Sequence, residues 1–116
     1  MLVGDIAGIC HEANRQYCVA NGDHSHDSWE ETDPELRQSA VEGVLAVLEI
    51  PEISNREMHR LWRESKVSLG WKWGPVKDSV KKEHPCICEY NLLPEYQRLK
   101  DALFINVVNT FREAVE

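Results

Sequence analysis

The chain has 116 residues, 42% of them hydrophobic, and its 13 basic and 20 acidic side chains give a formal net charge of −7. This length and composition predict one folded domain, residues 1–116, with a modest core. An acidic chain is poorly suited to sequence-independent binding of nucleic acid, which needs a basic surface. No apolar run reaches the roughly 18 residues that span a bilayer, and Asp5 interrupts a start without basic residues, so we expect a cytoplasmic protein with no membrane partner. In that compartment free thiols are expected for all four cysteines, Cys10, Cys18, Cys86 and Cys88.

The first helix is predicted over residues 5–20, where apolar side chains recur on one side at helical spacing and Asn21-Gly22 supplies a stop. The opposite side carries one polar stripe, formed by His11, Asn14, Arg15 and Cys18. Two interpretations of this stripe stay open. It is either a solvated face or a surface that meets a ligand or another subunit.

Two capping boxes predict the next two helices. Thr32-Asp33-Pro34-Glu35 opens a helix that stops before Pro51, and Ser54-Asn55-Arg56-Glu57 opens a helix that ends near Gly70. Between the first two helices, residues 23–31 form a polar loop whose only large apolar side chain, Trp29, is expected to pin it to the body.

The last helix is predicted to begin at Leu93-Pro94-Glu95, after a short strand or extended segment at residues 86–90. It has two apolar faces, and the second carries Phe104, Val108 and Phe111. Such a helix is either central to its own domain or half of an interface, so we predict a homodimer through residues 96–115, with intramolecular burial as the alternative. The whole chain is predicted to be mainly α-helical, with about four helices and one irregular or extended excursion at residues 71–85.

This excursion begins with Gly70-Trp71-Lys72-Trp73-Gly74-Pro75, where two indoles two residues apart would share one face of an extended segment. Lysines follow at Lys77, Lys81 and Lys82, and Asp78 is placed to cap a short helical turn that Pro85 ends. Aromatic faces ringed by cations suit a flat anionic ligand. The other interpretation is that both tryptophans are core residues and the lysines are solvated.

Neither a metal site nor a catalytic site is predicted. The candidate metal ligands are His24-x-His26 and His84-Pro85-Cys86-x-Cys88, but structural zinc sites usually pair their ligands at wider spacing, so we expect no metal and no cofactor. No local signature joins a nucleophile to a base, and no glycine-rich phosphate loop occurs. We therefore expect a protein that is not an enzyme.

The order and spacing of several motifs resemble a known family. The motifs are Leu61-Trp62, Gly70-Trp71-x-Trp73-Gly74-Pro75-x-x-Asp78, Lys82-x-His84-Pro85-Cys86, Tyr90 and Leu93-Pro94-Glu95. Together they resemble the ryanodine-receptor repeat (RyR) domain, which occurs in tandem in animal calcium-release channels and singly in small bacterial and phage proteins. The resemblance covers residues 53–110, with Trp73 where the family often has Tyr. Residues 1–52 resemble the helical extension of the single-copy prokaryotic proteins.

The resemblance implies a non-enzymatic module that binds a small, nucleotide-derived molecule, as a sensor or sponge in conflict between phage and host. It implies neither a channel nor calcium binding. The expected ligand-binding residues are Trp71, Trp73, Lys77, Asp78, Lys81 and His84, with His11, Asn14 and Arg15 from the first helix. The second hypothesis is a structural or protein-interaction domain that has no small-molecule ligand.

Overall fold

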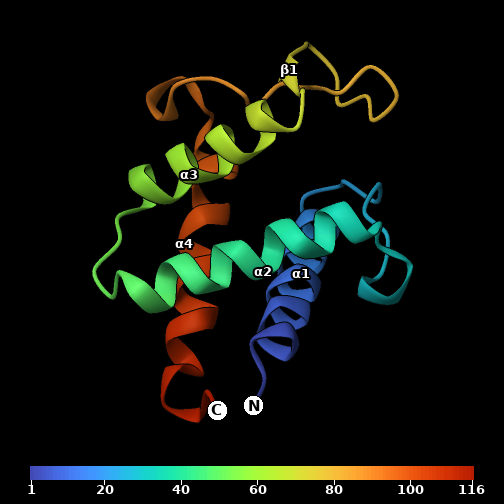
Figure 1. The fold of residues 1–116 in the computed structure, drawn as a ribbon. Helices are drawn as coiled ribbons and strands as arrows, with labels where there is room; N and C mark the ends of the chain where they lie inside the picture. Colours follow the sequence, from blue (N-terminus) through green and yellow to red (C-terminus); the bar gives the residue numbers. More distant parts are fainter. The chain divides into compact units, whose positions relative to one another are not determined.

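The computed structural model describes residues 1–116, and most of them are helical (Figure 1). The elements in chain order are α1 (Val3–Ala20), η1 (Trp29–Glu31), α2 (Pro34–Glu49), α3 (Asn55–Ser68), β1 (Lys72–Trp73), β2 (Glu83–His84), η2 (Tyr90–Leu92), α4 (Glu95–Thr110) and η3 (Arg112–Ala114). The predicted mainly α-helical class with four helices is confirmed. No helix combines the length and the apolar character needed to cross a bilayer.

The backbone divides into two compact units. Residues 1–53 and 102–116 form the first unit, and residues 54–101 form the second. In the first unit α1 packs against α2. Its largest fully buried side chains are those of Ile6, Cys10, Cys18, Val44, Val47 and Val108. Arg112, near the C-terminus, ties its segment to the end of α2, because its guanidinium donates hydrogen bonds to the carbonyls of Val47 and Leu48.

The helix starts follow the capping signals, with one shift. The Ser54 hydroxyl oxygen accepts a hydrogen bond from the Glu57 N–H, as predicted. At α2 the cap is Asp33, whose Oδ1 accepts from the Glu35 N–H, and the Thr32 hydroxyl instead donates to the Ser28 carbonyl. The predicted Thr32 cap is therefore wrong by one residue, because Thr32 is used to close the preceding loop.

Trp29 pins the polar loop to α1, as predicted. Its indole lies directly over Gly8, where an added Cβ atom would be 3.0 Å from the indole Nε1. The Arg37 guanidinium lies 5.4 Å from the centre of the same ring. The absence of a side chain at Gly8 thus makes room for the tryptophan that holds the loop.

The second apolar face of α4 is largely covered within the chain itself. Val108 is fully buried and Ile105 is nearly so, while Phe104 and Phe111 are half-buried. This burial corresponds to the alternative in which one chain covers both faces of the helix. The homodimer through residues 96–115 stays a prediction.

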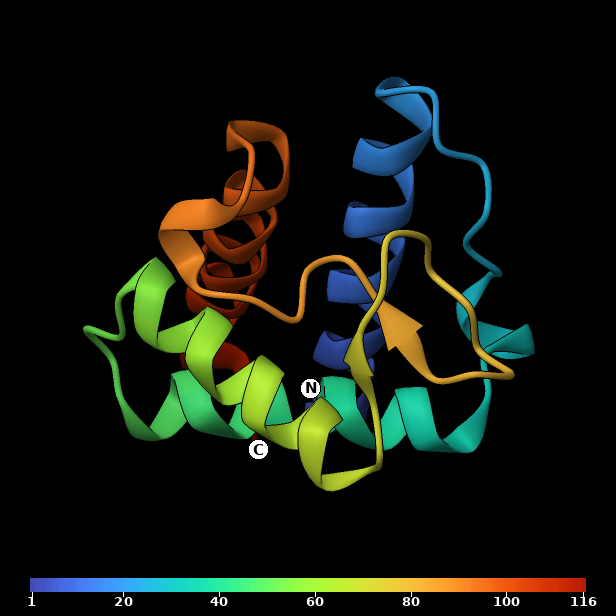
Figure 2. The same ribbon diagram turned by 90° about the horizontal axis from the view of Figure 1, so that it is seen from above.

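The second unit joins α3 to a small pair of strands. Strands β1 and β2 run parallel, with Lys72 opposite Glu83 and Trp73 opposite His84, and Figure 2 shows them side by side. The strand or extended segment predicted at residues 86–90 is not a strand, since those residues form turns that lead into η2. The strands lie earlier in the chain, and Gly70 and Lys82, which precede them, both have positive φ.

Candidate functional site

Backbone geometry at the end of α3 sets the position of the excursion (residues 71–85). Gly70 has φ +92°, and its N–H donates to the Val67 carbonyl while the Trp71 N–H donates to the Lys66 carbonyl. These two bonds make a Schellman motif, the usual way for a glycine to end a helix. Trp71 therefore leaves the helix in a fixed direction.

Two backbone segments of the excursion, at Gly74 and at Glu83, lie very close together. An added Cβ atom at Gly74 would lie 2.5 Å from the Cβ of Glu83, so only glycine fits beside β2. Inside the loop, Asp78 Oδ1 accepts hydrogen bonds from the N–H groups of Val80 and Lys81. The predicted cap at Asp78 is confirmed, and this side chain has a structural role in the loop.

The two predicted tryptophans differ in exposure. Trp71 is 9% exposed, with the Lys66 ammonium 5.2 Å from its ring centre, whereas Trp73 is 57% exposed. Partial exposure, which a ligand-binding role of Trp71 would need, is not found, because this residue joins the interior directly after the helix turn. Trp73 carries the accessible aromatic face of the excursion.

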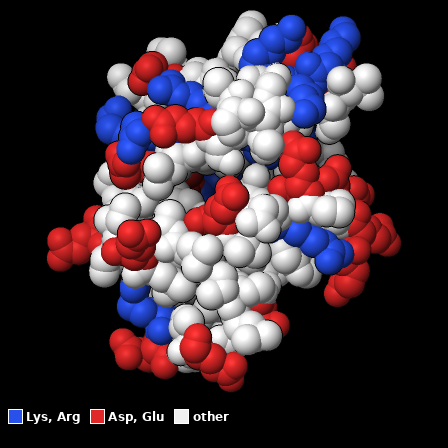
Figure 3. All heavy atoms as spheres, viewed as in Figure 1, with Lys and Arg blue, Asp and Glu red and all other residues white.

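The lysines predicted for the site lie at the surface of the excursion. Lys77 and Lys81 are exposed, as are Val76 and Val80, which are 71% and 95% exposed. Figure 3 shows Lys and Arg side chains gathered at the end of the view where Figure 1 places β1. The tip of the excursion is thus both cationic and apolar.

Aromatic rings form a continuous row in the second unit. In spatial order the rings are those of Trp71, His84, Trp62, His59 and Tyr90, and neighbouring centres lie 5.1–6.4 Å apart. The predicted site residue His84 lies inside this row, where its Nδ1 accepts a hydrogen bond from the Cys86 N–H. The Arg56 guanidinium lies 5.2 Å from the Tyr90 ring centre at the far end.

A cationic pocket of about 140 Å³ opens at the Tyr90 end of the row. It is lined by Arg56, His59, Arg60, Arg63, Glu89 and Tyr90. Arg63 pairs with Glu89 at 3.2 Å, and Arg60 pairs with Glu57 and Glu64 along α3. Three guanidinium groups thus line the pocket, and two of them, those of Arg60 and Arg63, are paired with carboxylates.

Sequence reasoning missed this pocket although α3 carried a signal for it. Positions 56, 60 and 63 recur at helical spacing, which places their side chains on one face. The sequence prediction took its cations from the stretch around the two tryptophans and, with Arg15, from the first helix. Arg56 and Arg63 were not considered as candidate site residues.

His59 is held inside the second unit beside a buried acid. Its Nε2 lies 2.9 Å from the Cys88 carbonyl, and its Nδ1 lies 4.0 Å from the Asp101 carboxylate. Burial lowers the pKa of His59 and raises the pKa of Asp101 to about 7. The imidazole is therefore neutral near physiological pH and presents a flat, uncharged ring to the pocket.

The helix residues predicted for the site, His11, Asn14 and Arg15, belong to the first unit. His11 Nε2 lies 2.7 Å from the Asp27 carbonyl, and Arg15 pairs with Glu12 at 3.0 Å. Glu12 also accepts from the Trp29 N–H. Two of the three predicted residues thus have local partners that hold the polar loop, and their role toward a ligand stays a prediction.

The cysteines are all free thiols. Burial raises the pKa of the Cys86 thiol to about 11 and of Cys10 to about 12, so neither is a thiolate at neutral pH. The metal-ligand candidates named from sequence gather no set of three donors around His84. A set of three does form in the first unit, from Cys18, Asp23 and His26.

Comparison with protein families identifies the second unit and its flanks. The family model of the RyR domain matches residues 45–111. The match spans α3, both strands, η2 and all of α4, and it includes the aromatic row and the cationic pocket. Because it covers more than half of the 116 residues, the chain belongs to the RyR domain family.

Proposed function

We propose that this chain is a non-enzymatic module that binds a nucleotide-derived molecule, with the anionic part of the ligand in the cationic pocket of the second unit. The observation that carries the proposal is the lining of that pocket, where three arginines lie beside the rings of His59 and Tyr90. Guanidinium groups match phosphate oxygens in geometry, and flat rings stack on bases. A ligand that combines both chemistries is a nucleotide.

The size of the pocket limits what it encloses. A volume of about 140 Å³ is below the range of pockets that bury a drug-sized ligand. We therefore infer that the pocket holds one part of the ligand, a phosphate group beside the Tyr90 and His59 rings. The remainder of the molecule lies at the surface.

The biological setting is part of the same proposal. The sequence resemblance to single-copy prokaryotic RyR proteins supports a role as sensor or sponge for nucleotide signals in conflict between phage and host. The four free thiols are typical of a reducing compartment and support a cytoplasmic location.

Calorimetric titration with mono-, di- and cyclic nucleotides tests the function, with uncharged nucleosides as controls. Arg56→Gln and Arg63→Gln should each weaken binding about tenfold or more, the cost of a lost hydrogen bond to a charged group. Lys77→Gln and Lys81→Gln remove the same charge from the excursion and serve as matched controls. Loss of binding in the lysine variants alone would move the ligand to the excursion, and absence of all nucleotide binding would refute the function.

A second candidate is a protein-interaction domain. Trp73, Val76 and Val80 are all exposed on the excursion, and exposed large apolar side chains are frequent in protein interfaces. Trp73→Ala separates the candidates. It should leave nucleotide affinity unchanged if the pocket holds the ligand, and it should reduce capture of a protein partner if the tip is the functional surface.

A further inference from the structure

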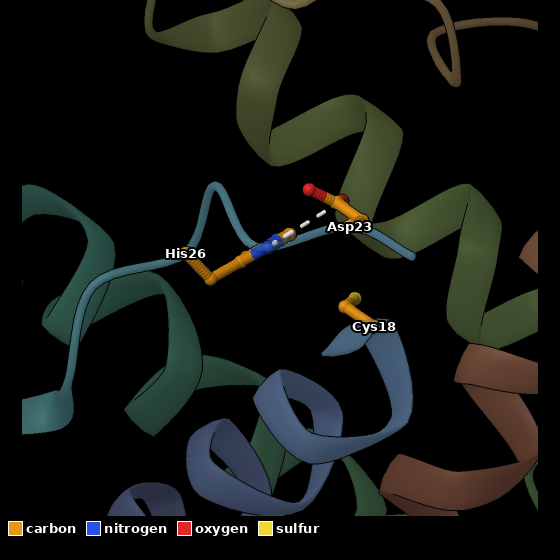
Figure 4. Close-up of side chains that lie close together, drawn as sticks. All are labelled: Cys18, Asp23 and His26. Carbon is orange, nitrogen blue, oxygen red and sulfur yellow. Dashed lines mark ion pairs between the residues drawn. The ribbon is translucent and has the colours of Figure 1, made fainter. Parts of the chain in front are cut away.

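We propose that Cys18, Asp23 and His26 form a binding site for one zinc ion in the first unit. Their donor atoms, one thiol sulfur, one carboxylate oxygen and one imidazole nitrogen, all lie within 4.8 Å of one another. Figure 4 shows the Asp23 carboxylate facing the His26 ring, with the Cys18 side chain projecting toward both from the end of α1. This site is independent of the nucleotide pocket.

The end of α1 places the thiol and the carboxylate together. The Gly22 N–H donates to the Val19 carbonyl, and the Asp23 N–H donates to the Cys18 carbonyl at 2.8 Å, which makes a Schellman motif with Gly22 at φ +87°. This motif folds the chain back over the last helical turn. Asp23 is therefore fixed beside Cys18, although five positions separate them in sequence.

A short turn then brings in the histidine. Asp23 Oδ1 accepts hydrogen bonds from the N–H and the hydroxyl of Ser25, at 3.0 and 2.6 Å. The other oxygen, Oδ2, faces His26 Nδ1 at 3.7 Å. Serine thus acts as an outer-shell partner that orients the carboxylate, a role such partners have in metal sites.

Donor distances fit one shared ion. Zinc–ligand bonds of about 2.0–2.3 Å place two tetrahedral ligands about 3.3–3.6 Å apart. The separation of 3.7 Å between Asp23 Oδ2 and His26 Nδ1 is close to that value and longer than an ordinary hydrogen bond. The remaining donor distances, all at most 4.8 Å, close with side-chain movements of about 1 Å.

Ligand chemistry selects zinc over the hard divalent cations. Sulfur and imidazole donors bind zinc well, whereas magnesium and calcium take oxygen ligands. Binding converts the Cys18 thiol to a thiolate and releases its proton to solvent. Thiolate and carboxylate then carry two negative charges that neutralise the ion. Cys18 is fully buried, and the three protein ligands leave the fourth tetrahedral position for a water molecule.

The spacing of candidate metal ligands along the sequence did not indicate this site. The search by spacing paired His24 with His26, yet His24 is exposed and is not among the three gathered donors. Cys18 was placed on a polar stripe, whereas the structure buries it. The expectation of no metal therefore considered His26 but neither Cys18 nor Asp23 as a ligand.

The test uses the full, untagged chain, freed of metal with a chelator. Competition with a chromophoric chelator should give one zinc per chain, with affinity that falls as pH is lowered. Cobalt should give the intense charge-transfer absorption of a metal–thiolate bond, and magnesium in excess should not compete. A cobalt spectrum without that absorption would overturn the proposal with no need for any variant.

Variants then locate the ion. Cys18→Ser, Asp23→Asn and His26→Gln should each weaken zinc binding at least about tenfold, and Cys18→Ser should also abolish the charge-transfer band. His24→Gln, on the same loop, and Cys88→Ser, a thiol outside the cluster, should change neither. Circular dichroism of each variant checks folding. Zinc that Cys18→Ser retains, or that Cys88→Ser loses, would place the ion elsewhere and refute the site.

Discussion

At the scale of single residues, Asp101 is a buried acid whose ionisation opposes the fold at neutral pH. Its pKa is raised to about 7 by burial, whereas an unfolded Asp titrates near 3.8. The folded state therefore binds the proton more tightly than the unfolded state. The stability that this proton contributes is complete below the unfolded pKa and is lost as pH rises through about 7.

We expect Asp101→Asn to raise the free energy of unfolding at pH 8 by on the order of 1–4 kcal/mol, because it removes the cost of the buried charge. The gain should shrink toward pH 4, where folded Asp101 is protonated and keeps most of the stability that its proton contributes. Urea unfolding at several pH values measures it. Asp27→Asn, at an exposed aspartate, is the control and should show no such trend. A gain equal at pH 4 and pH 8 would contradict this account.

Trp71 and Trp73 offer a second comparison at this scale. Trp71 is 9% exposed and packs against Lys66 and His84, whereas Trp73 is 57% exposed. Trp71→Ala should lower the free energy of unfolding by about 3–5 kcal/mol, the usual cost of truncating a buried aromatic. Trp73→Ala should lower it by less than about 1 kcal/mol. Denaturant unfolding of the two variants distinguishes them, and equal losses would contradict the difference in burial.

At the scale of elements, two glycines on helices have opposite expected effects. Gly70 ends α3 at φ +92°, a conformation that an alanine adopts only with strain. Gly4 lies inside α1 with open space around it. We expect Gly70→Ala to lower the melting temperature through a loss of about 1–2 kcal/mol. Gly4→Ala should raise it through a gain of up to about 1 kcal/mol, because alanine favours the helix. Calorimetry of both variants tests the pair, and a stabilised Gly70→Ala would show that the turn is not set by φ.

Local sequence signals predicted the helices well, whereas the pairing of the two strands was not predicted from the sequence. Ser54 caps α3 and Gly70 ends it as predicted, because both effects depend on neighbouring residues alone. The pairing of β1 with β2 depends on Gly74 meeting Glu83 nine positions away, and no short pattern encodes that approach. The strand was accordingly predicted at the wrong residues.

The candidate sites were predictable only in part, for the same reason. The stretch around Trp71 and Trp73 was recognised as aromatic and cationic, but burial of one indole and exposure of the other arises from packing. The arginine face of α3 was visible as a spacing and went unused. The donors of the zinc site meet through a Schellman motif at Gly22, which sequence reasoning predicted as a stop and not as a fold-back.

At the scale of the whole molecule, the net charge is negative, whereas three arginines line the pocket. The chain carries −7, which repels anions at long range, so in the proposed function an anionic ligand is attracted to the three arginines of the pocket only at short range. Salt therefore has two opposing effects. Salt screens the long-range repulsion between the acidic chain and an anionic ligand, which favours binding. It also screens the short-range attraction between the arginines and that ligand, which weakens binding.

We expect the local attraction to dominate the affinity, because guanidinium–phosphate contacts are much shorter than the screening length. Raising salt from about 0.1 M to about 1 M shortens that length from about 10 Å to about 3 Å and should weaken nucleotide binding about tenfold. Arg63→Gln should bind more weakly at low salt and respond less to added salt, since one of the screened contacts is gone. Lys81→Gln, on the excursion, should keep the full response. Titrations at several salt concentrations measure the slopes, and an affinity that rises with salt would show that the net charge, and not the pocket, governs binding.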